Sequence, residues 1–436
     1  MTDKLIVLFF YCRTRVLYRL FSVNSFKSFY QRIYLRKILT FVKRKSPYYR
    51  NISSTSISEQ DFIDKNKLNE FFNIINTEKL DYSKCIEMAL ESERSRDFSP
   101  TINDVTVMLS SGTSGNRGIL LTSDYERYKW AGSILGRVLP GSIFGKYKIA
   151  LFLRANSNIF TATNSKNIKF NFFDMLNDFD SNLEKLEELN PDILVAPASV
   201  LKMIAKAIEN NRLQINPLKV ISTAEVLNDL DRIYIEKKFE KTIFQIYQCT
   251  EGFLGHSCEY GHIHLNEDLV YFEKEYISKE QGRFVPILTD YFRKTLPIIR
   301  YRLNDILIEL EDKCPCGSPY MAIKKIEGRE DDVFYFSATE DKSHVPVFSD
   351  FLRRAIICSS DDIEEYKVEQ ISLEEIIIYL RLKNESQAQS VKDEILKNIE
   401  HLGTVKKIIT PKVSFEGYNF VPTIGKMKRV ERKFSL

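Results

Sequence analysis

Between residues 148 and 250, short apolar runs alternate with longer amphipathic stretches, and this alternation limits the possible folds more than any other feature. The apolar runs are typical of buried strands, and the stretches between them are typical of helices. Strands that alternate with helices form βαβ units around a parallel sheet, with ligands on the loops at the carboxyl ends of the strands. The sequence therefore predicts an α/β fold, with strands at 148–154, 192–197, 218–226 and 242–250 and helices near 180–190 and at 198–211 and 227–238.

The chain is long for a single hydrophobic core, at 436 residues. Beyond residue 330 the pattern changes to two strands within 364–383, a helix at 386–403 and a strand region within 405–418. The polar segment IEGREDDVF, at 326–334, separates the two patterns. We expect a large N-terminal domain of βαβ units with parallel sheets over 1–328, a hinge at 329–332, and a small, mobile α+β lid domain over 333–436.

The first 50 residues form a basic arm with twelve Lys and Arg residues and one acid, Asp3. Its apolar run Leu5–Cys12 is too short to span a membrane, and the periodicity of 24–50 predicts a helix that ends before Pro47. We expect this arm to pack on the body of the protein rather than to contact a membrane or nucleotide phosphates. A net charge of +4 gives little attraction for nucleic acid. Together these features predict a cytoplasmic protein that does not bind nucleic acid.

The segment VMLSSGTSGNRGILLT, residues 107–122, interrupts an apolar run with small polar residues. Glycines let backbone N–H groups turn toward an anion, hydroxyls add donors, and Arg117 adds positive charge. The same composition also fits a surface hairpin turn. The segment by itself leaves both interpretations open.

Five further motifs follow this loop in order: STAEV at 222–226, YQCTEG at 247–252, RYRLNDI at 300–306, GREDD at 328–332 and TIGKMKR at 423–429. Together they resemble the signature of the adenylate-forming superfamily, which includes acyl-CoA synthetases and peptide-synthetase adenylation domains. The resemblance covers nearly the whole chain. It is greatest to the phenylacetate-CoA ligase and coenzyme F390 synthetase branch, from LPIIRYRLNDI and the short C-terminal domain.

The resemblance implies a site for ATP and Mg²⁺. Thr250 would donate to the α-phosphate, Glu251 would hold Mg²⁺, and Lys426 on the mobile domain would stabilise charge as the acyl-adenylate forms. The phosphate loop would comprise Ser110, Ser111, Gly112, Thr113, Ser114, Gly115 and Arg117.

The resemblance also implies contacts with the nucleoside. Asp305 would accept hydrogen bonds from both ribose hydroxyls, Arg329 would contact ribose or phosphate, and Asp332 would be the hinge residue. The family usually has Thr-Gly before this Asp, where this chain has Leu303-Asn304. The adenine pocket would be lined by Ser222, Thr223, Ala224, Glu225 and Tyr247, with Thr223-Ala224 in place of the common paired glycines.

Cysteines and histidines gather in two further segments, HSCEYGHIHLNED at 256–268 and CPCG at 314–317. Zn²⁺ favours four such nitrogen and sulfur ligands, and a site without an open position is structural. By resemblance to the F390 synthetase-like branch, the ligands would be Cys258, His264, Cys314 and Cys316, with His262 as the alternative histidine. The other cysteines are scattered and do not suggest a secreted disulfide framework.

Three functions are consistent with these residues. The first activates a carboxylic acid with ATP and passes the acyl group to a thiol, either CoA or the phosphopantetheine of an acyl carrier protein. The second moves AMP onto a hydroxyl acceptor, as in coenzyme F390 synthesis. The third is a relative without catalysis that binds nucleotide or a membrane through its basic arm. The retention of Thr250-Glu251, Asp305 and Lys426 disfavours it. We expect the first, with an aryl or apolar acid bound near Phe253 and Leu254.

Overall fold

The computed structural model describes residues 3–53, 57, 60–110, 117–341, 343–419 and 428–434. The chain divides into two compact units. The first unit comprises 1–303 and 308–325, and the second comprises 304–307 and 326–436. Each unit is described on its own below, and the hinge at 329–332 stays a prediction.

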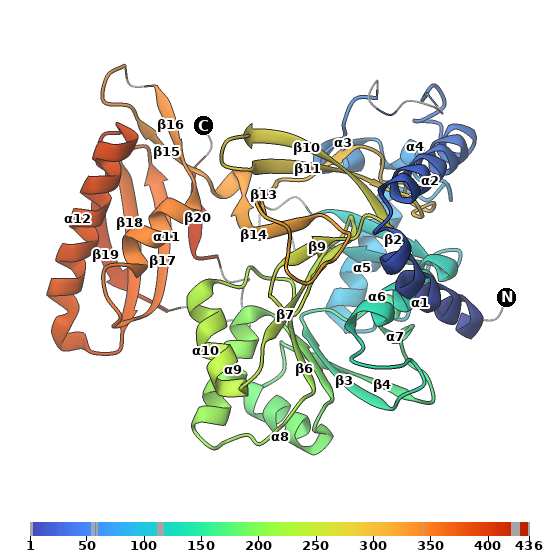
Figure 1. The fold of residues 1–436 in the computed structure, drawn as a ribbon, viewed down its shortest axis with the longest axis horizontal. Helices are drawn as coiled ribbons and strands as arrows, with labels where there is room; N and C mark the ends of the chain where they lie inside the picture. Colours follow the sequence, from blue (N-terminus) through green and yellow to red (C-terminus); the bar gives the residue numbers. More distant parts are fainter. Residues whose placement is uncertain are drawn as a thin grey trace. The chain divides into compact units, whose positions relative to one another are not determined.

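The helices of the first unit precede the sheet or alternate with its strands (Figure 1). In chain order they are α1 Asp3–Leu20, α2 Asn24–Lys45, α3 Lys65–Glu70, α4 Phe72–Ile75, α5 Tyr82–Ser95, α6 Asp124–Val138, α7 Asn158–Thr161, α8 Phe179–Leu189, α9 Ala198–Glu209 and α10 Asp229–Phe239.

Within the described residues, twelve strands form one sheet in the order β10-β11-β13-β14-β9-β8-β7-β6-β5-β3-β4, with β12 beside β11. The strands are β3 Tyr147–Leu153, β4 Ile168–Asp174, β5 Ile193–Ala196, β6 Lys219–Ser222, β7 Ile243–Cys249, β8 Gly252–Ser257, β9 Ile263–Leu265, β10 Val270–Ser278, β11 Arg283–Asp290, β12 Tyr301–Arg302, β13 Asp305–Glu309 and β14 Ala322–Arg329. A separate antiparallel pair joins β1 Val105–Leu109 to β2 Ile119–Ser123.

The sheet has a parallel half and an antiparallel half. Strands β4, β3, β5, β6 and β7 pair in parallel, with α8, α9 and α10 in the crossovers between them. From β7 onward, β8 and β9 pair antiparallel. The α/β fold class predicted from the alternation is confirmed, and the structure adds the antiparallel half, which the sequence did not reveal.

The parallel half is a closed hydrophobic core. Strand β5 is buried along its whole length, as parallel strands covered on both faces are. Residues from α8, α9 and α10 pack on it, including Leu186, Leu201 and Ile235, each at 0% exposure. This core holds the carboxyl ends of β6 and β7 in place.

The N-terminal arm packs against α6. A Cβ on Gly132 would lie 2.3 Å from the carbonyl oxygen of Val7, so α1 and α6 approach at backbone distance. Behind this contact, Arg137 of α6 donates to the buried carboxylate of Asp268, and Arg13 of α1 donates to its carbonyl at 3.0 Å. The arm is therefore part of the first unit's core.

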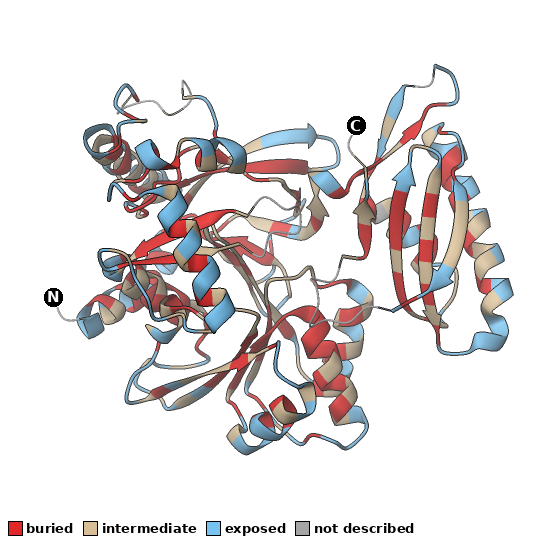
Figure 2. Cartoon of the chain, turned by 180° about the vertical axis from the view of Figure 1, so that it is seen from behind, coloured by how far each residue is buried: buried red, intermediate tan, exposed pale blue. Residues whose placement is uncertain are grey.

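The second unit contains a four-stranded sheet in the order β19-β18-β17-β20, with a two-stranded pair of β15 and β16. Along β18, buried and partly exposed residues alternate, as expected of a sheet with one covered face (Figure 2). The two helices of this unit, α11 Ser349–Ile357 and α12 Ala388–Lys406, pack against each other. The elements are β15 Phe334–Ser337, β16 His344–Val347, α11 Ser349–Ile357, β17 Ile363–Ser372, β18 Glu375–Leu382, α12 Ala388–Lys406, β19 Lys412–Gly417 and β20 Val430–Arg432.

Among the described residues, a search of the helices finds none with the length and apolar character that crossing a membrane requires.

The substitution Gly132→Ala tests the contact between α1 and α6. We expect it to lower the free energy of unfolding by about 2–3 kcal/mol, because the added methyl overlaps backbone atoms that cannot move independently. Urea unfolding followed by circular dichroism measures the loss. Gly417→Ala is the control, because its Cβ would meet nothing within 4 Å. Equal stability of the two variants would contradict the close approach.

Candidate functional site

The turn between β7 and β8 carries Thr250 and Glu251, at the carboxyl end of the last parallel strand. The Glu251 carboxylate accepts hydrogen bonds from the Thr250 hydroxyl at 2.9 Å and from the Tyr301 hydroxyl at 2.8 Å. The carbonyl oxygen of Thr250 accepts from Nη1 of Arg293 at 2.5 Å. The orientation of both residues is thus fixed by side chains that are distant in sequence.

Tyr301 donates to Glu251 throughout the ordinary pH range. Burial, followed by the neighbouring Glu251 carboxylate, raises the pKa of Tyr301 far above its usual value. The phenol therefore keeps its proton and its role as donor. Glu251 is half-buried, and its carboxylate oxygens are the type of ligand that a hard cation prefers.

The glycine-rich loop is closed at its neck. Ser110 N–H donates to the Gly118 carbonyl at 2.7 Å, and Gly118 N–H donates to the Ser110 hydroxyl at 2.7 Å. A Cβ on Gly118 would lie 3.6 Å from Oγ1 of Thr250, so the neck stands beside the β7–β8 turn. The predicted loop residues Ser111, Gly112, Thr113, Ser114 and Gly115 lie outside the described residues.

Arg117, predicted to supply positive charge to phosphates, is already paired. Its Nη1 and Nη2 lie 2.7 and 2.5 Å from the two carboxylate oxygens of Glu93, and its Nε donates to the Ser110 carbonyl. Such a bidentate pair is geometrically specific and satisfies most of the guanidinium. In this conformation Arg117 holds the neck of the loop, and a phosphate would have to compete with Glu93 for it.

The predicted adenine residues follow the neighbouring strand β6. Oγ of Ser222 is buried and has no hydrogen-bond partner among the described residues, which is an observation consistent with a ligand there. Ala224 has φ of 63°, the left-handed conformation that glycine adopts without strain. Glu225 accepts from Ser199 N–H at 3.0 Å, in the first turn of α9, and so caps that helix. Tyr247 is 6% exposed, so most of its surface packs inside the protein.

The second unit brings two predicted nucleoside residues together. Nε of Arg329 lies 3.7 Å from the Asp305 carboxylate. Asn304, one of the two residues where this chain departs from the family pattern, donates to Asp331 at 2.9 Å and accepts from Glu330 N–H. The departure therefore has a local structural role, because it ties the Asp305 loop to the 329–331 segment.

Asp332, the predicted hinge residue, is buried and lies 3.0 Å from Nζ of Lys428. Burial raises the pKa of its carboxyl, and the Lys428 charge opposes that rise. Lys426, the predicted lid lysine, lies outside the described residues.

Cys258, His264, Cys314 and Cys316 converge, with donor atoms that all lie within 4.8 Å of one another. The sulfurs of Cys258 and Cys314 are 3.6 Å apart, and Sγ of Cys316 is 3.3 Å from Nε2 of His264. For Zn–S bonds of about 2.3 Å, tetrahedral geometry separates ligands by about 3.8 Å. Three sulfurs and one nitrogen at these separations fit Zn²⁺. These four ligands complete a tetrahedral set and leave no open position.

The histidine that belongs to this set is His264. Its Nδ1 lies 3.1 Å from the Tyr320 carbonyl, an acceptor that leaves Nε2 free to face the sulfurs. His262 reaches one sulfur, that of Cys314, at 3.3 Å. Burial raises the pKa of the Cys316 thiol to about 12 and also raises that of Cys258. A cation at the centre would favour the thiolates that this burial disfavours.

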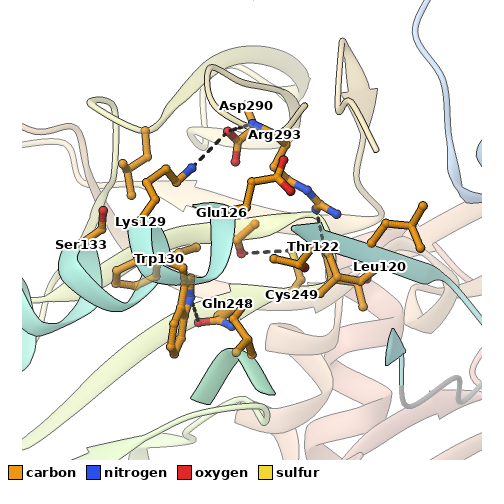
Figure 3. A pocket seen from close by; sticks show the side chains of 16 residues that line it. Leu120, Thr122, Glu126, Lys129, Trp130, Ser133, Gln248, Cys249, Asp290 and Arg293 are labelled. Atoms are coloured by element: carbon orange, nitrogen blue, oxygen red, sulfur yellow. Dashed lines mark hydrogen bonds and ion pairs between the residues drawn. The ribbon is translucent and has the colours of Figure 1, made fainter. Parts of the chain in front are cut away.

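A pocket of about 60 Å³ lies beside Thr250, between α6, β2 and the β7–β8 turn (Figure 3). Of the two residues predicted to lie near the acid, Phe253 lines this pocket and Leu254 does not. Its wall also includes four residues of α6 that were not predicted from the sequence, which are Glu126, Lys129, Trp130 and Ser133. One signal was present, because charged residues at 126 and 129 interrupt the buried face of an amphipathic helix.

No protein-family model matches the chain. Protein CapK of Staphylococcus aureus is 28% identical over 254 residues, which are 57% of this chain and 54% of CapK. The match thus spans about half the length of that relative.

Two solved structures share the fold. A 2-hydroxyisobutyryl-CoA ligase in complex with an acyl-AMP superposes with a TM-score of 0.68 at 12% identity, over 94% of this chain and 90% of that one. The GH3.15 acyl acid amido synthetase superposes with a TM-score of 0.56 at 12% identity, over 88% and 85% of the two chains. The chain therefore has the fold of adenylate-forming ligases, and at this identity the likeness establishes the fold alone.

Because three cysteines and one histidine converge, we predict that the protein binds a metal ion at this site. We expect the purified protein to hold zinc, and Cys316→Ser to lose it together with thermal stability, because the binding free energy of a structural metal is part of the folding free energy. Elemental analysis and thermal unfolding measure the two effects. The control Cys358→Ser, at an exposed cysteine of the second unit, should keep the metal. Retention of a full complement of zinc by Cys316→Ser would contradict the assignment.

Proposed function

We propose that this protein activates a carboxylic acid with ATP, forming an acyl-adenylate and pyrophosphate, and then transfers the acyl group to a thiol. The observation that carries this proposal is the placement of Thr250 and Glu251 beside the closed neck of the Ser110–Gly118 loop. The fold shared with ligases solved as acyl-AMP complexes supports it.

The residues of the β7–β8 turn have suitable chemistry for the phosphate end. Glu251 would hold Mg²⁺, which supplies neutralisation of the triphosphate charge when it is bound. Tyr301 keeps the carboxylate oriented through its hydrogen bond. The Thr250 hydroxyl, which donates to Glu251 here, would donate instead to the α-phosphate.

The remaining roles follow the motif order. Asp305 and Arg329 would bind the ribose, and Ser222–Glu225 with Tyr247 would line the adenine pocket. Lys426 would approach the α-phosphate when the small domain turns about Asp332, because a lysine on a closing lid stabilises charge that develops only in the transition state. The cluster of Cys258, His264, Cys314 and Cys316 would be a structural zinc site. The expected location is the cytoplasm, where ATP and thiol acceptors are available.

The acceptor is proposed to be CoA or the phosphopantetheine of a carrier protein. One structural relative is named an amido synthetase, so the same fold is also used with an amine acceptor. An AMP transfer to a hydroxyl remains the alternative. Product analysis separates these reactions, since a thioester or amide is accompanied by free AMP and a hydroxyl acceptor retains the adenylate.

Acid-dependent ATP–pyrophosphate exchange tests the first half-reaction. We expect exchange in the wild type, and a loss of about 100-fold or more in Glu251→Gln, because one charged oxygen ligand of the metal is replaced by a neutral amide. Glu280→Gln, at an exposed residue, is the control and should retain full exchange.

Lys426→Ala should slow exchange while leaving the folded protein intact. An absence of exchange with every acid tested, in wild-type protein that binds ATP, would exclude acyl activation. Accumulation of an adenylated alcohol would instead select the hydroxyl-acceptor alternative.

A further inference from the structure

Three residues that line the pocket beside Thr250 each carry a buried polar side-chain atom that the described part of the chain leaves without a partner. The atoms are Oγ1 of Thr122, Oγ of Ser133 and Nη2 of Arg293, on residues that are 5%, 0% and 7% exposed. A buried polar group without a hydrogen bond costs about 1–3 kcal/mol. Three such atoms around one cavity point to a ligand that satisfies them.

The lining holds four charged side chains, and three of them, Glu126, Asp290 and Lys129, are engaged with other groups of the protein. Glu126 accepts from the backbone N–H groups of Ser123, Lys294 and Thr295, so its carboxylate is already satisfied. Burial is the largest single influence on the pKa of Glu126 and raises it. The hydrogen bonds together outweigh burial, so the pKa is lowered overall.

Asp290, the second carboxylate, accepts from the N–H groups of Phe292 and Arg293 and lies 3.8 Å from Nζ of Lys129. With Arg293 as the second cation, the lining holds two negative and two positive groups. A second carboxylate or an ammonium group on a bound acid would therefore find no free counter-charge.

The orphaned atoms lie toward different ends of the pocket. Nη1 of Arg293 bonds the Thr250 carbonyl, so Nη2 of the same guanidinium is near the proposed site of adenylation. Ser133 lies one turn after Lys129 on α6, and Figure 3 draws Lys129 between Ser133 and Arg293. Trp130, whose Nε1 donates to Gln248 at 3.2 Å, forms the apolar wall beside them.

Resting on the proposed function, we propose that the acid activated here carries an uncharged hydrogen-bonding substituent, such as a hydroxyl, which the hydroxyl of Ser133 or of Thr122 binds while Arg293 takes the reacting carboxylate. A pocket built to hydrogen-bond such a group rejects analogues that lack it, because its own polar atoms are then left unpaired. This assignment adds an uncharged hydrogen-bonding group to the aryl or apolar acid expected from Phe253.

The test is ATP–pyrophosphate exchange with matched acids: lactate against propionate, 3-hydroxybutyrate against butyrate, 4-hydroxybenzoate against benzoate, and succinate as the doubly charged comparison. We expect kcat/KM for at least one hydroxy acid to exceed that of its deoxy partner by about 100-fold. Succinate should be a poor substrate.

Two variants connect the preference to the pocket. Ser133→Ala or Thr122→Val should reduce the hydroxy-to-deoxy ratio about 10-fold, since each removes one hydrogen bond that only the hydroxy acid makes. The control is Thr106→Val. Thr106 faces Thr122 across the β1–β2 pair, is also buried and unpartnered, and does not line the pocket.

Thermal unfolding of each variant, with and without the preferred acid, separates a folding defect from lost binding. A ratio near one in the wild type, or a ratio unchanged in both pocket variants, would overturn the substrate inference and leave acyl activation standing. If none of the acids supported exchange, both the substrate inference and the proposed acyl activation would be overturned.

Discussion

Strand β7 joins the parallel and the antiparallel half of the large sheet, and the rest of the site depends on this position. On one edge it pairs in parallel with β6, and on the other it pairs antiparallel with β8. The chain must therefore reverse tightly after Cys249, and Thr250 and Glu251 occupy that reversal. The hydrophobic core under β5 and β6 fixes where the parallel half ends, and so fixes where these two polar residues are displayed.

The antiparallel half holds the other side of the same turn. β8 starts directly after Glu251 and ends at Ser257, next to Cys258, and β9 contains His264. The two cysteines at 314 and 316 reach this pair from a distant loop. A cation held by these four residues would cross-link the far end of β8, which would make the turn at its near end more rigid.

Helix α6 connects the arm to the pocket. One face carries Gly132, where the backbone of α1 approaches closely, and another carries Glu126, Lys129 and Ser133. The basic arm thus supports the helix that forms one wall of the pocket. Its half-buried cation Arg13 is engaged with the Asp268 carbonyl, which explains part of the arm's charge by packing rather than by a ligand.

The sequence by itself determined features that depend on local periodicity and on residue chemistry. The alternation after residue 148 predicted the parallel half, and the types and order of Thr250, Glu251, Asp305 and the four metal-ligand candidates could be read directly. The tertiary structure decided how long-range contacts use those groups. Glu93 pairs with Arg117, Tyr301 orients Glu251, and the pocket beside Thr250 gains polar side chains from α6. The contacts of Glu93 with Arg117 and of Tyr301 with Glu251 leave no periodic signal, because each joins residues separated by at least 24 positions, whose proximity only the packed core establishes.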